Sequence, residues 1–257
     1  MIHVHDVWKR YGNLEVLKGL TLDIFDGETL VILGRSGVGK SVLLKQIIGL
    51  EVPDKGYIEV DGTLVTDLNA RTFRPGLKPM GMLFQGSALF DSMDVGDNTS
   101  FYLRQHYPSL PFSEVSDRVA EALEMVGLKG IQRKMPSELS GGMRKRAALA
   151  RLIVYRPEII LYDEPTTGLD PITSMQINDL INQTKKELKA TSIVVTHDIR
   201  SALEVGDRLA FHADGKIAQI AAKKEFLEID DPLLREFFNN SIIDKADLEM
   251  YKNRGGF

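Results

Sequence analysis

The sequence predicts an α/β fold with a parallel central sheet. Three short runs are continuously apolar, which is typical of strands buried on both faces: Thr29–Leu33, Ile159–Tyr162 and Ser192–Thr196. Helical patterns follow the first two runs, over Val42–Leu50 and Ile172–Leu188. Alternation of buried strands with helices of this length favours parallel pairing of the strands.

An antiparallel strand layer is predicted near the start of the chain. Apolar and polar residues alternate over Ile2–Trp8, Leu20–Ile24 and Tyr57–Gly62, as in strands with one buried face, and Tyr11–Asn13 is expected to turn between the first two. Trp8 is expected in the core of this layer. The sequence thus predicts an antiparallel β subdomain beside the parallel core.

The character of the chain becomes helical from about residue 92 to 156. Glu114–Val126 is strongly helical and is stopped by Gly127, and a second helix, Met143–Tyr155, ends before Pro157. We therefore expect an inserted helical subdomain over about residues 92–156, inside a main domain that spans residues 1–225.

A C-terminal helical tail is expected over residues 226–257. Its apolar face could pack on the chain's own domain or dock on a second copy or an accessory subunit, because left exposed it would form an apolar patch. We expect residues 253–257 to be loose. The face consists of Leu233, Leu234, Phe237 and Phe238.

Composition excludes several classes of function. The chain has 257 residues, 43% of them hydrophobic and 26% charged, which is typical of a globular protein. The net charge of −4 gives no overall basic field, so no nucleic-acid partner is expected. The absence of cysteine excludes disulfides, thiolate metal sites and a cysteine nucleophile. No apolar stretch approaches the roughly 18 residues of a membrane-spanning helix, and no leader is expected before the first strand.

A phosphate-binding loop directly follows the first buried run. The pattern G-x-x-x-x-G-K-[ST], between a strand and a helix, is the P-loop of nucleotide-binding proteins. Its backbone N–H groups cradle phosphate oxygens, Lys40 neutralises the β- and γ-phosphates, and the Ser41 hydroxyl ligates Mg²⁺. The sequence therefore predicts a P-loop NTPase core. The pattern is met by Gly34, Arg35, Ser36, Gly37, Val38, Gly39, Lys40 and Ser41, and the helix continues from Val42.

Two carboxylates follow the second buried run. Asp163 stands where a P-loop protein places its metal-binding carboxylate, which reaches Mg²⁺ directly or through water. Glu164 comes next and is the candidate for polarising the attacking water. The structural alternative is a strand that simply ends in acidic residues before a turn at Pro165.

Two further polar residues follow predicted strands. His197 comes after the third buried run, at the strand end where parallel sheets bind their ligands, and is the candidate for a γ-phosphate contact. Gln85 follows Met82–Phe84 and can offer a carbonyl to a metal and an amide to water. The alternatives are a structural histidine and an ordinary loop residue.

Tyr11 is the candidate for stacking on an adenine ring, because a planar side chain in a turn ahead of the P-loop can cover a base. The alternative is a partly buried turn aromatic.

A second glycine-rich helix start lies far downstream of the P-loop, at Leu139–Gly142. Ser140 suits an N-cap, and Gly141 and Gly142 let a ligand approach backbone N–H groups that favour an anion. One chain thus has two phosphate-binding surfaces and a single P-loop. We therefore expect two copies to pair, each contributing this helix start to the nucleotide held by the other. The cations that follow, Arg144, Lys145 and Arg146, are expected to form a solvated or ion-paired helix face.

The ordered set of motifs resembles that of ATP-binding-cassette ATPases over residues 2–225. The resemblance rests on the P-loop, Gln85, Leu139–Gly142, Asp163–Glu164, Gly168–Asp170 and His197. It implies that ATP is sandwiched between two P-loop domains, with Ser140 and Gly142 contacting the partner's γ-phosphate and Asp170 bridging the halves. It also implies that Gln85 and Gly86–Met93 sense a membrane subunit.

Finer features are similar to the ATPases of lipid transporters that work with mammalian-cell-entry-type proteins, including the maintenance-of-lipid-asymmetry system. Met143 replaces the usual glutamine after the glycines, and three further segments match: Ser41–Lys45, Gln85–Met93 and Pro171–Ser174. This resemblance implies an ATP- and Mg²⁺-dependent subunit that drives phospholipid transport between membranes of a bacterial envelope.

The partners implied by this resemblance are integral membrane permease subunits, a lipid-binding mammalian-cell-entry-type protein and a small accessory subunit. The implied location is cytoplasmic, peripheral on the inner face of the cytoplasmic membrane. Two alternatives remain open: the same ATPase on another importer or exporter, and a soluble cassette protein acting in translation, DNA maintenance or cluster assembly.

Overall fold

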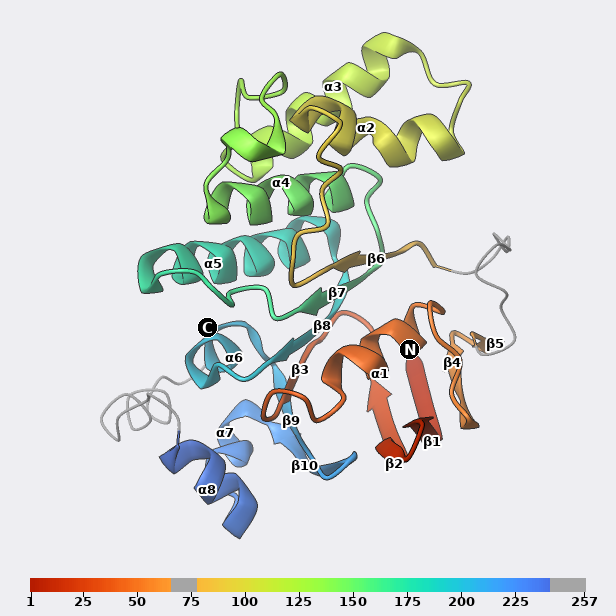
Figure 1. The fold of residues 1–257 in the computed structure, drawn as a ribbon, viewed down its shortest axis with the longest axis vertical. Helices are drawn as coiled ribbons and strands as arrows, with labels where there is room; N and C mark the ends of the chain where they lie inside the picture. The colour runs from red at the N-terminus through yellow and green to blue at the C-terminus, as the bar shows by residue number, and fades with distance from the viewer. Residues whose placement is uncertain (66–77, 241–257) are drawn as a thin grey trace. The chain divides into compact units, whose positions relative to one another are not determined.

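The computed structural model describes residues 1–65 and 78–240. The chain divides into two compact units, one formed by Met1–Lys78 with Thr191–Phe257 and the other by Pro79–Ala190 (Figure 1). Within the described ranges no helix is long and apolar enough to cross a lipid bilayer.

The first unit contains an antiparallel sheet with the strand order β2-β1-β4-β5. Its core is formed by alternating apolar side chains, because one face of each strand is buried. The strands are β1 (Ile2–Tyr11), β2 (Leu14–Ile24), β4 (Lys55–Val60) and β5 (Thr63–Leu64).

Trp8 does not lie in the core of this sheet, so that expectation is wrong. The side chain is half-buried, its indole N–H donates to Asp6 at 3.1 Å, and the Lys55 ammonium lies 5.7 Å from the ring centroid. Register shifts on both sides of Val7 interrupt the alternation of β1, so the indole lies among charges at the surface.

The first unit also contains a group of parallel strands. β3 (Thr29–Leu33) pairs in parallel with both β8 (Thr191–Thr196) and β9 (Arg208–Ala213), and β10 (Lys216–Ala222) pairs antiparallel with β9. All five residues of β3 are buried, as the continuous apolar run predicts. The helices α1 (Lys40–Ile47) and α6 (Ile199–Val205) follow β3 and β8.

The C-terminal segment forms two short helices, α7 (Lys223–Phe226) and α8 (Pro232–Asn239). Leu234 and Phe237 of α8 are buried within the first unit, and the Phe237 ring lies 5.3 Å from that of Phe211 in β9. For these two residues the packing is therefore intramolecular, whereas Leu233 is exposed. The predicted loose end at residues 253–257 and the rest of the tail from 241 lie outside the described residues.

The second unit contains a parallel strand pair and a group of helices. β6 (Met80–Leu83) pairs with β7 (Ile159–Asp163). The elements between and after these strands are α2 (Val95–His106), α3 (Phe112–Met125), the 3₁₀ turn η1 (Pro136–Glu138), α4 (Gly141–Ile153) and α5 (Pro171–Leu188). α4 packs against both α2 and α3. The α/β fold class, with parallel and antiparallel sheets and inserted helices, is confirmed.

Candidate nucleotide-binding site

The P-loop forms the turn between β3 and α1, and its path requires glycine. Gly37 and Gly39 have φ angles of 82° and 106°, in the left-handed region that side chains disfavour. At Gly34, an added Cβ would lie 2.6 Å from the main-chain oxygen of His212. The loop therefore follows a tight backbone path, as a phosphate cradle requires.

Lys40 is buried at the start of α1. Its ammonium donates hydrogen bonds to the main-chain oxygens of Gly34 at 2.7 Å and Arg35 at 3.0 Å. α1 has no side-chain cap and no acidic residue in its first turn. A fixed ammonium and the positive end of a helix dipole both favour an anion here.

His197 lies at the same sheet edge as the P-loop. Leu33 at the end of β3 is paired with Thr196 at the end of β8, so the P-loop and His197 continue from paired residues. The His197 side chain is exposed. This is the position at which parallel sheets bind ligands.

Tyr11 lies at the end of β1 with an exposed ring. Its hydroxyl donates to the carboxylate of Glu51, and the Lys9 ammonium lies 5.6 Å from the ring centroid. Burial of the hydroxyl raises the pKa of Tyr11, and the hydrogen bond and charge of Glu51 raise it further, to about 12. Glu51 therefore fixes the orientation of the ring through its neutral hydroxyl.

Glu236 of α8 forms an ion pair with the P-loop residue Arg35. The sequence did not predict this contact. The Glu236 carboxylate pairs with the Arg35 guanidinium at 2.6 Å, between side chains that are both more than half exposed. An exposed ion pair of this kind contributes at most about 1 kcal/mol to the free energy of unfolding. The two residues are 201 positions apart, so nothing in the local pattern indicates the contact.

In the second unit, Ser140 is the N-cap of α4. Its hydroxyl accepts a hydrogen bond from the Met143 N–H at 3.3 Å. Gly142 is buried, and an added Cβ would lie 2.5 Å from the Thr173 methyl group of α5. Gly141 is exposed. The helix start is therefore capped and closely packed, with glycine required at residue 142.

Asp163 and Glu164 are buried where β7 ends. Glu164 has a φ of 48°, in the left-handed region that is uncommon for a residue with a side chain. Its carboxylate accepts a hydrogen bond from the Thr167 hydroxyl at 3.0 Å. A strained backbone at a candidate catalytic group indicates that the surrounding structure holds it in place.

Lys145 of α4 is buried, so the expectation of a solvated cationic face is wrong at this residue. Its ammonium donates to the main-chain oxygens of Gln85 at 2.5 Å and Glu164 at 3.3 Å. Burial lowers the pKa of Lys145, and the charges of Asp163 and Glu164 oppose that shift. The side chain turns inward because two main-chain carbonyls converge on it.

The neighbouring Arg144 is exposed, as expected, and donates to the Leu139 main-chain oxygen at 2.7 Å. The side chain of Gln85 is exposed.

Asp170 is the N-cap of α5. Its carboxylate accepts from the N–H groups of Ile172 and Thr173 at 3.1 and 3.0 Å, and from the Thr173 hydroxyl at 2.6 Å. The hydrogen bonds from Thr173 lower the pKa of Asp170. The carboxylate therefore caps the start of α5.

The candidate site residues are divided between the two units. The first unit holds Tyr11, the P-loop with Val42, and His197, and the second holds Gln85, Ser140–Gly142, Asp163, Glu164 and Asp170. Within the second unit, Lys145 joins Gln85 to Glu164.

The donors expected for Mg²⁺ are all oxygens. They are the hydroxyl of Ser41, the amide of Gln85 and the carboxylate of Asp163, which suits a hard cation that retains phosphate and water ligands. Among residues 1–65 and 78–240, no group of three or more His, Cys, Asp or Glu side chains could hold a metal by itself. Oxygen donors of these types are the ligands that Mg²⁺ prefers in proteins.

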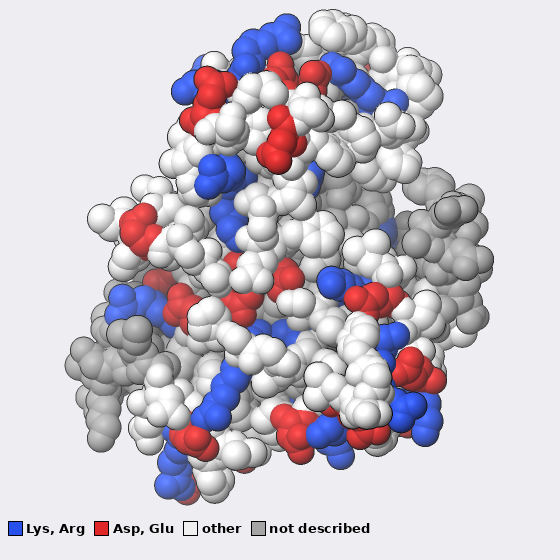
Figure 2. All heavy atoms as spheres, in the orientation of Figure 1, with Lys and Arg blue, Asp and Glu red and all other residues white. Residues whose placement is uncertain are grey.

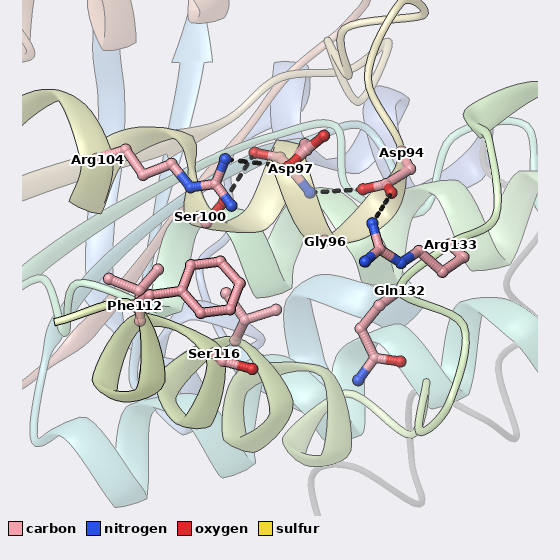
Figure 3. A pocket seen from close by; sticks show the side chains of 11 residues that line it. Asp94, Gly96, Asp97, Ser100, Arg104, Phe112, Ser116, Gln132 and Arg133 are labelled. Atoms are coloured by element: carbon pink, nitrogen blue, oxygen red, sulfur yellow. Dashed lines mark hydrogen bonds and ion pairs between the residues drawn. The ribbon is translucent and has the colours of Figure 1, made fainter.

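A separate pocket lies within the helices of the second unit (Figure 3). Its volume is about 200 Å³. Arg104 pairs with Asp97 at 3.2 Å, and Arg133 pairs with Asp94 at 3.4 Å. Its charges are thus matched within its own lining, which includes none of the candidate nucleotide-binding residues.

On the face drawn in Figure 2, positive and negative side chains are likewise interspersed.

The fold and these motifs define a P-loop ATPase, and comparison with known proteins gives its family. The sequence pattern of the ABC transporter family matches residues 17–167. The chain therefore belongs to the ABC transporter family and is an ATP-binding, ATP-hydrolysing subunit.

Two curated relatives and one solved structure illustrate the similarity. The chain is 42% identical over 252 residues to the probable ribonucleotide transport ATP-binding protein mkl of Mycobacterium leprae, covering 98% of this chain and 72% of the relative. It is 38% identical over 239 residues to the intermembrane phospholipid transport system ATP-binding protein MlaF of Escherichia coli K12, covering 93% and 88%. A dimeric ATP-binding cassette in a post-hydrolysis state, bound to ADP and Pi, matches with a TM-score of 0.78 and 31% identity, covering 87% of this chain and 99% of that one.

Proposed function

We propose that this ATPase lies at the inner face of the cytoplasmic membrane and drives phospholipid transport, as a pair of identical copies bound to integral membrane permease subunits. The similarity to MlaF over 93% of the chain carries this proposal, supported by Met143 and the segment Gln85–Met93. A lipid-binding mammalian-cell-entry-type protein and a small accessory subunit are the further partners that we propose. The name of the mkl relative favours a second candidate, the ATPase of a transporter for ribonucleotides.

Each copy binds one nucleotide through its first unit. The Tyr11 ring stacks on the adenine, and the P-loop from Gly34 to Val42 encloses the phosphates, with Lys40 against the β- and γ-phosphates. Mg²⁺, when bound, is held by Ser41, Asp163 and Gln85 and neutralises charge on the phosphate oxygens. The buried ammonium of Lys40 supports this assignment, because it is already held at the loop.

Hydrolysis requires a water in line with the bond between the γ-phosphorus and the β–γ bridging oxygen. Glu164 accepts a hydrogen bond from this water and orients it, and the His197 imidazole contacts the γ-phosphate. The water oxygen bonds to phosphorus as the bridging oxygen leaves on ADP, and the products are ADP and Pi. The fixed carboxylate orientation given by Thr167 supports this role for Glu164.

The second copy completes the site. Ser140, Gly141 and Gly142 of one copy present the start of α4 to the γ-phosphate bound by the other, and Asp170 bridges the two copies. Two phosphate-binding surfaces in separate units of one chain support this arrangement, as does the dimeric state of the solved relative.

The catalytic assignment is tested by Glu164→Gln and Lys40→Ala. Glu164→Gln should retain ATP binding, accumulate as a closed dimer and hydrolyse at least about a hundredfold more slowly, because only the water-orienting carboxylate is lost. Lys40→Ala should instead weaken ATP binding. Glu158→Gln, an exposed carboxylate before β7, is the matched control and should behave as wild type. Wild-type turnover by Glu164→Gln would remove Glu164 from this role.

The transport assignment is tested by purifying the tagged chain from detergent-solubilised membranes and identifying proteins and lipids by mass spectrometry. A permease with a lipid-binding protein and bound phospholipid would support the proposal. A permease of another substrate class would leave the ATPase in place and overturn the lipid assignment.

A further inference from the structure

We propose that Lys145 is a positioning residue, which ties the loop from Gln85 to Phe90 to the backbone of Glu164 and so makes hydrolysis depend on the position of that loop. The inference deepens the proposed function, because it rests on the roles proposed above for Gln85 and Glu164.

Lys145 is almost fully buried. Its side chain is 5% exposed, and a lysine this buried is rare unless its ammonium is hydrogen-bonded. The ammonium donates to the main-chain oxygen of Gln85 at 2.5 Å and to that of Glu164 at 3.3 Å. One cation thus joins Gln85 and Glu164, which are 79 residues apart in the chain.

The second observation is the backbone of Glu164. Its φ of 48° places the residue in a conformation that costs on the order of 1 kcal/mol or more for a non-glycine residue. The Lys145 ammonium and the Thr167 N–H both donate to the Glu164 carbonyl oxygen, each at 3.3 Å. These bonds stabilise the peptide orientation that directs the Glu164 side chain. Loss of the ammonium would let the backbone relax and displace the carboxylate.

The third observation is a second cation on α4 that holds the same loop. Arg151 donates to the main-chain oxygens of Ala88 at 2.7 Å and Ser87 at 3.3 Å, and its guanidinium carbon lies 5.6 Å from the Phe90 ring centroid. Ser87 and Ala88 also have positive φ angles, of 64° and 49°. The loop is therefore bound to α4 through its carbonyls at two points.

A displacement of the loop has a direct route to the catalytic carboxylate. Movement of the Gln85 carbonyl alters the position of the Lys145 ammonium, which in turn changes the hydrogen bond to Glu164. Because α4 begins at Gly141, the same helix that carries Lys145 also presents the Ser140 cap. The loop and the backbone of Glu164 are thus joined through a side chain of the helix that begins at the glycine-rich segment.

The test is Lys145→Met in the full chain, which keeps an unbranched side chain of similar length and removes the donors. We expect kcat for ATP hydrolysis to fall about tenfold or more, while the Kd for ATP stays within about twofold, because the phosphate cradle lies elsewhere. Lys145→Arg, which keeps charged donors, should recover part of kcat. Lys129→Met removes an exposed lysine of the same unit and should match wild type.

A double mutant separates positioning from general destabilisation. If Lys145 acts through Glu164, adding Lys145→Met to Glu164→Gln should leave the residual rate unchanged, whereas an independent role would lower it by the same factor as in the single variant. Full wild-type kcat in Lys145→Met, with Glu164→Gln impaired, would overturn this inference and leave the proposed function intact. Wild-type kcat in Glu164→Gln would instead overturn the proposed function.

Thermal unfolding of each variant checks the fold. Should Lys145→Met fail to fold, Lys145→Gln gives the answer, because its neutral amide stays polar but is one bond shorter than lysine and lacks the charge that joins the two carbonyls. A reduced kcat with an unchanged Kd for ATP in Lys145→Gln would support the inference, and a wild-type kcat would overturn it.

Discussion

The hydroxyl of Thr167 donates a hydrogen bond of 3.0 Å to the carboxylate of Glu164. The two residues belong to one tight turn, in which the Thr167 N–H also donates to the Glu164 carbonyl at 3.3 Å. One carboxylate oxygen is thereby oriented by the protein. The Thr167 hydroxyl thus helps to hold the carboxylate that is proposed to orient the attacking water.

Thr167→Val should therefore impair hydrolysis without impairing binding. A hydrogen bond to a charged group contributes about 1.5–3 kcal/mol, so we expect kcat to fall by about tenfold or more with the Kd for ATP unchanged. Steady-state hydrolysis and equilibrium nucleotide binding measure the two quantities. Thr167→Ser keeps the hydroxyl and should retain most of kcat; equal loss in both variants would contradict a role for the hydroxyl.

The aromatic ring of Tyr11, rather than its hydroxyl, should contribute to the affinity for ATP. Stacking of a base on an aromatic ring is worth about 1–3 kcal/mol, so Tyr11→Ala should weaken ATP binding by about tenfold. Tyr11→Phe loses only the hydrogen bond to Glu51 and should bind ATP within about threefold of wild type. Fluorescent-nucleotide titration distinguishes the variants, and unchanged affinity in Tyr11→Ala would remove Tyr11 from the adenine site.

His212 should make the stability of the fold depend on pH. The imidazole is almost fully buried, and neither ring nitrogen has a hydrogen-bond partner. Burial, with a smaller contribution from Lys40, lowers the pKa of His212 from 6.5 to about 4. Below pH 6.5 the unfolded chain takes up a proton that the folded chain binds only near pH 4.

The free energy of unfolding contributed by His212 is therefore constant above pH 6.5 and falls as the pH is lowered toward 4, by about 3 kcal/mol in all. Urea unfolding of wild type and His212→Leu across this range measures the difference. The two stability curves should converge with rising pH if leucine removes only this proton linkage. A constant offset between them would show that His212 titrates alike in both states.

The contribution of α8 to the free energy of unfolding should come from the side chains that it buries within the first unit. Leu234 is fully buried and Leu233 is 53% exposed, which makes them a matched pair one position apart. Leu234→Ala should lower the free energy of unfolding by about 2 kcal/mol or more, whereas Leu233→Ala should change it by less than about 0.5 kcal/mol. Chemical denaturation checks both values, and equal effects would mean that α8 does not pack as the structure shows.

Local patterns were sufficient to predict the strands that carry the site. Thr29–Leu33 is found as β3 with the predicted bounds, and the runs at Ile159 and Thr191 differ from the predicted strands by one residue each. A continuous apolar run flanked by polar residues is buried whichever neighbours it pairs with. The glycines of the P-loop were likewise readable, because their backbone angles depend on a few adjacent residues.

Features that depend on distant segments could not be read from the sequence. Lys145 lies in a cationic triplet that is typical of a solvated face, and only the carbonyls of Gln85 and Glu164 draw it inward. The left-handed backbone of Glu164 has no signal in its residue type. The contact from Glu236 to Arg35 likewise forms only once the tail folds back.

The surface position of Trp8 gives the chain a built-in optical probe. It is the single tryptophan among 257 residues, so selective excitation of indole reports one place on β1, three residues before Tyr11. Its indole N–H donates to the Asp6 carboxylate and the Lys55 ammonium lies over its ring, and indole emission responds to nearby charge. Indole emission can thus report in real time, without an attached dye, whether nucleotide binding alters the surroundings of this ring.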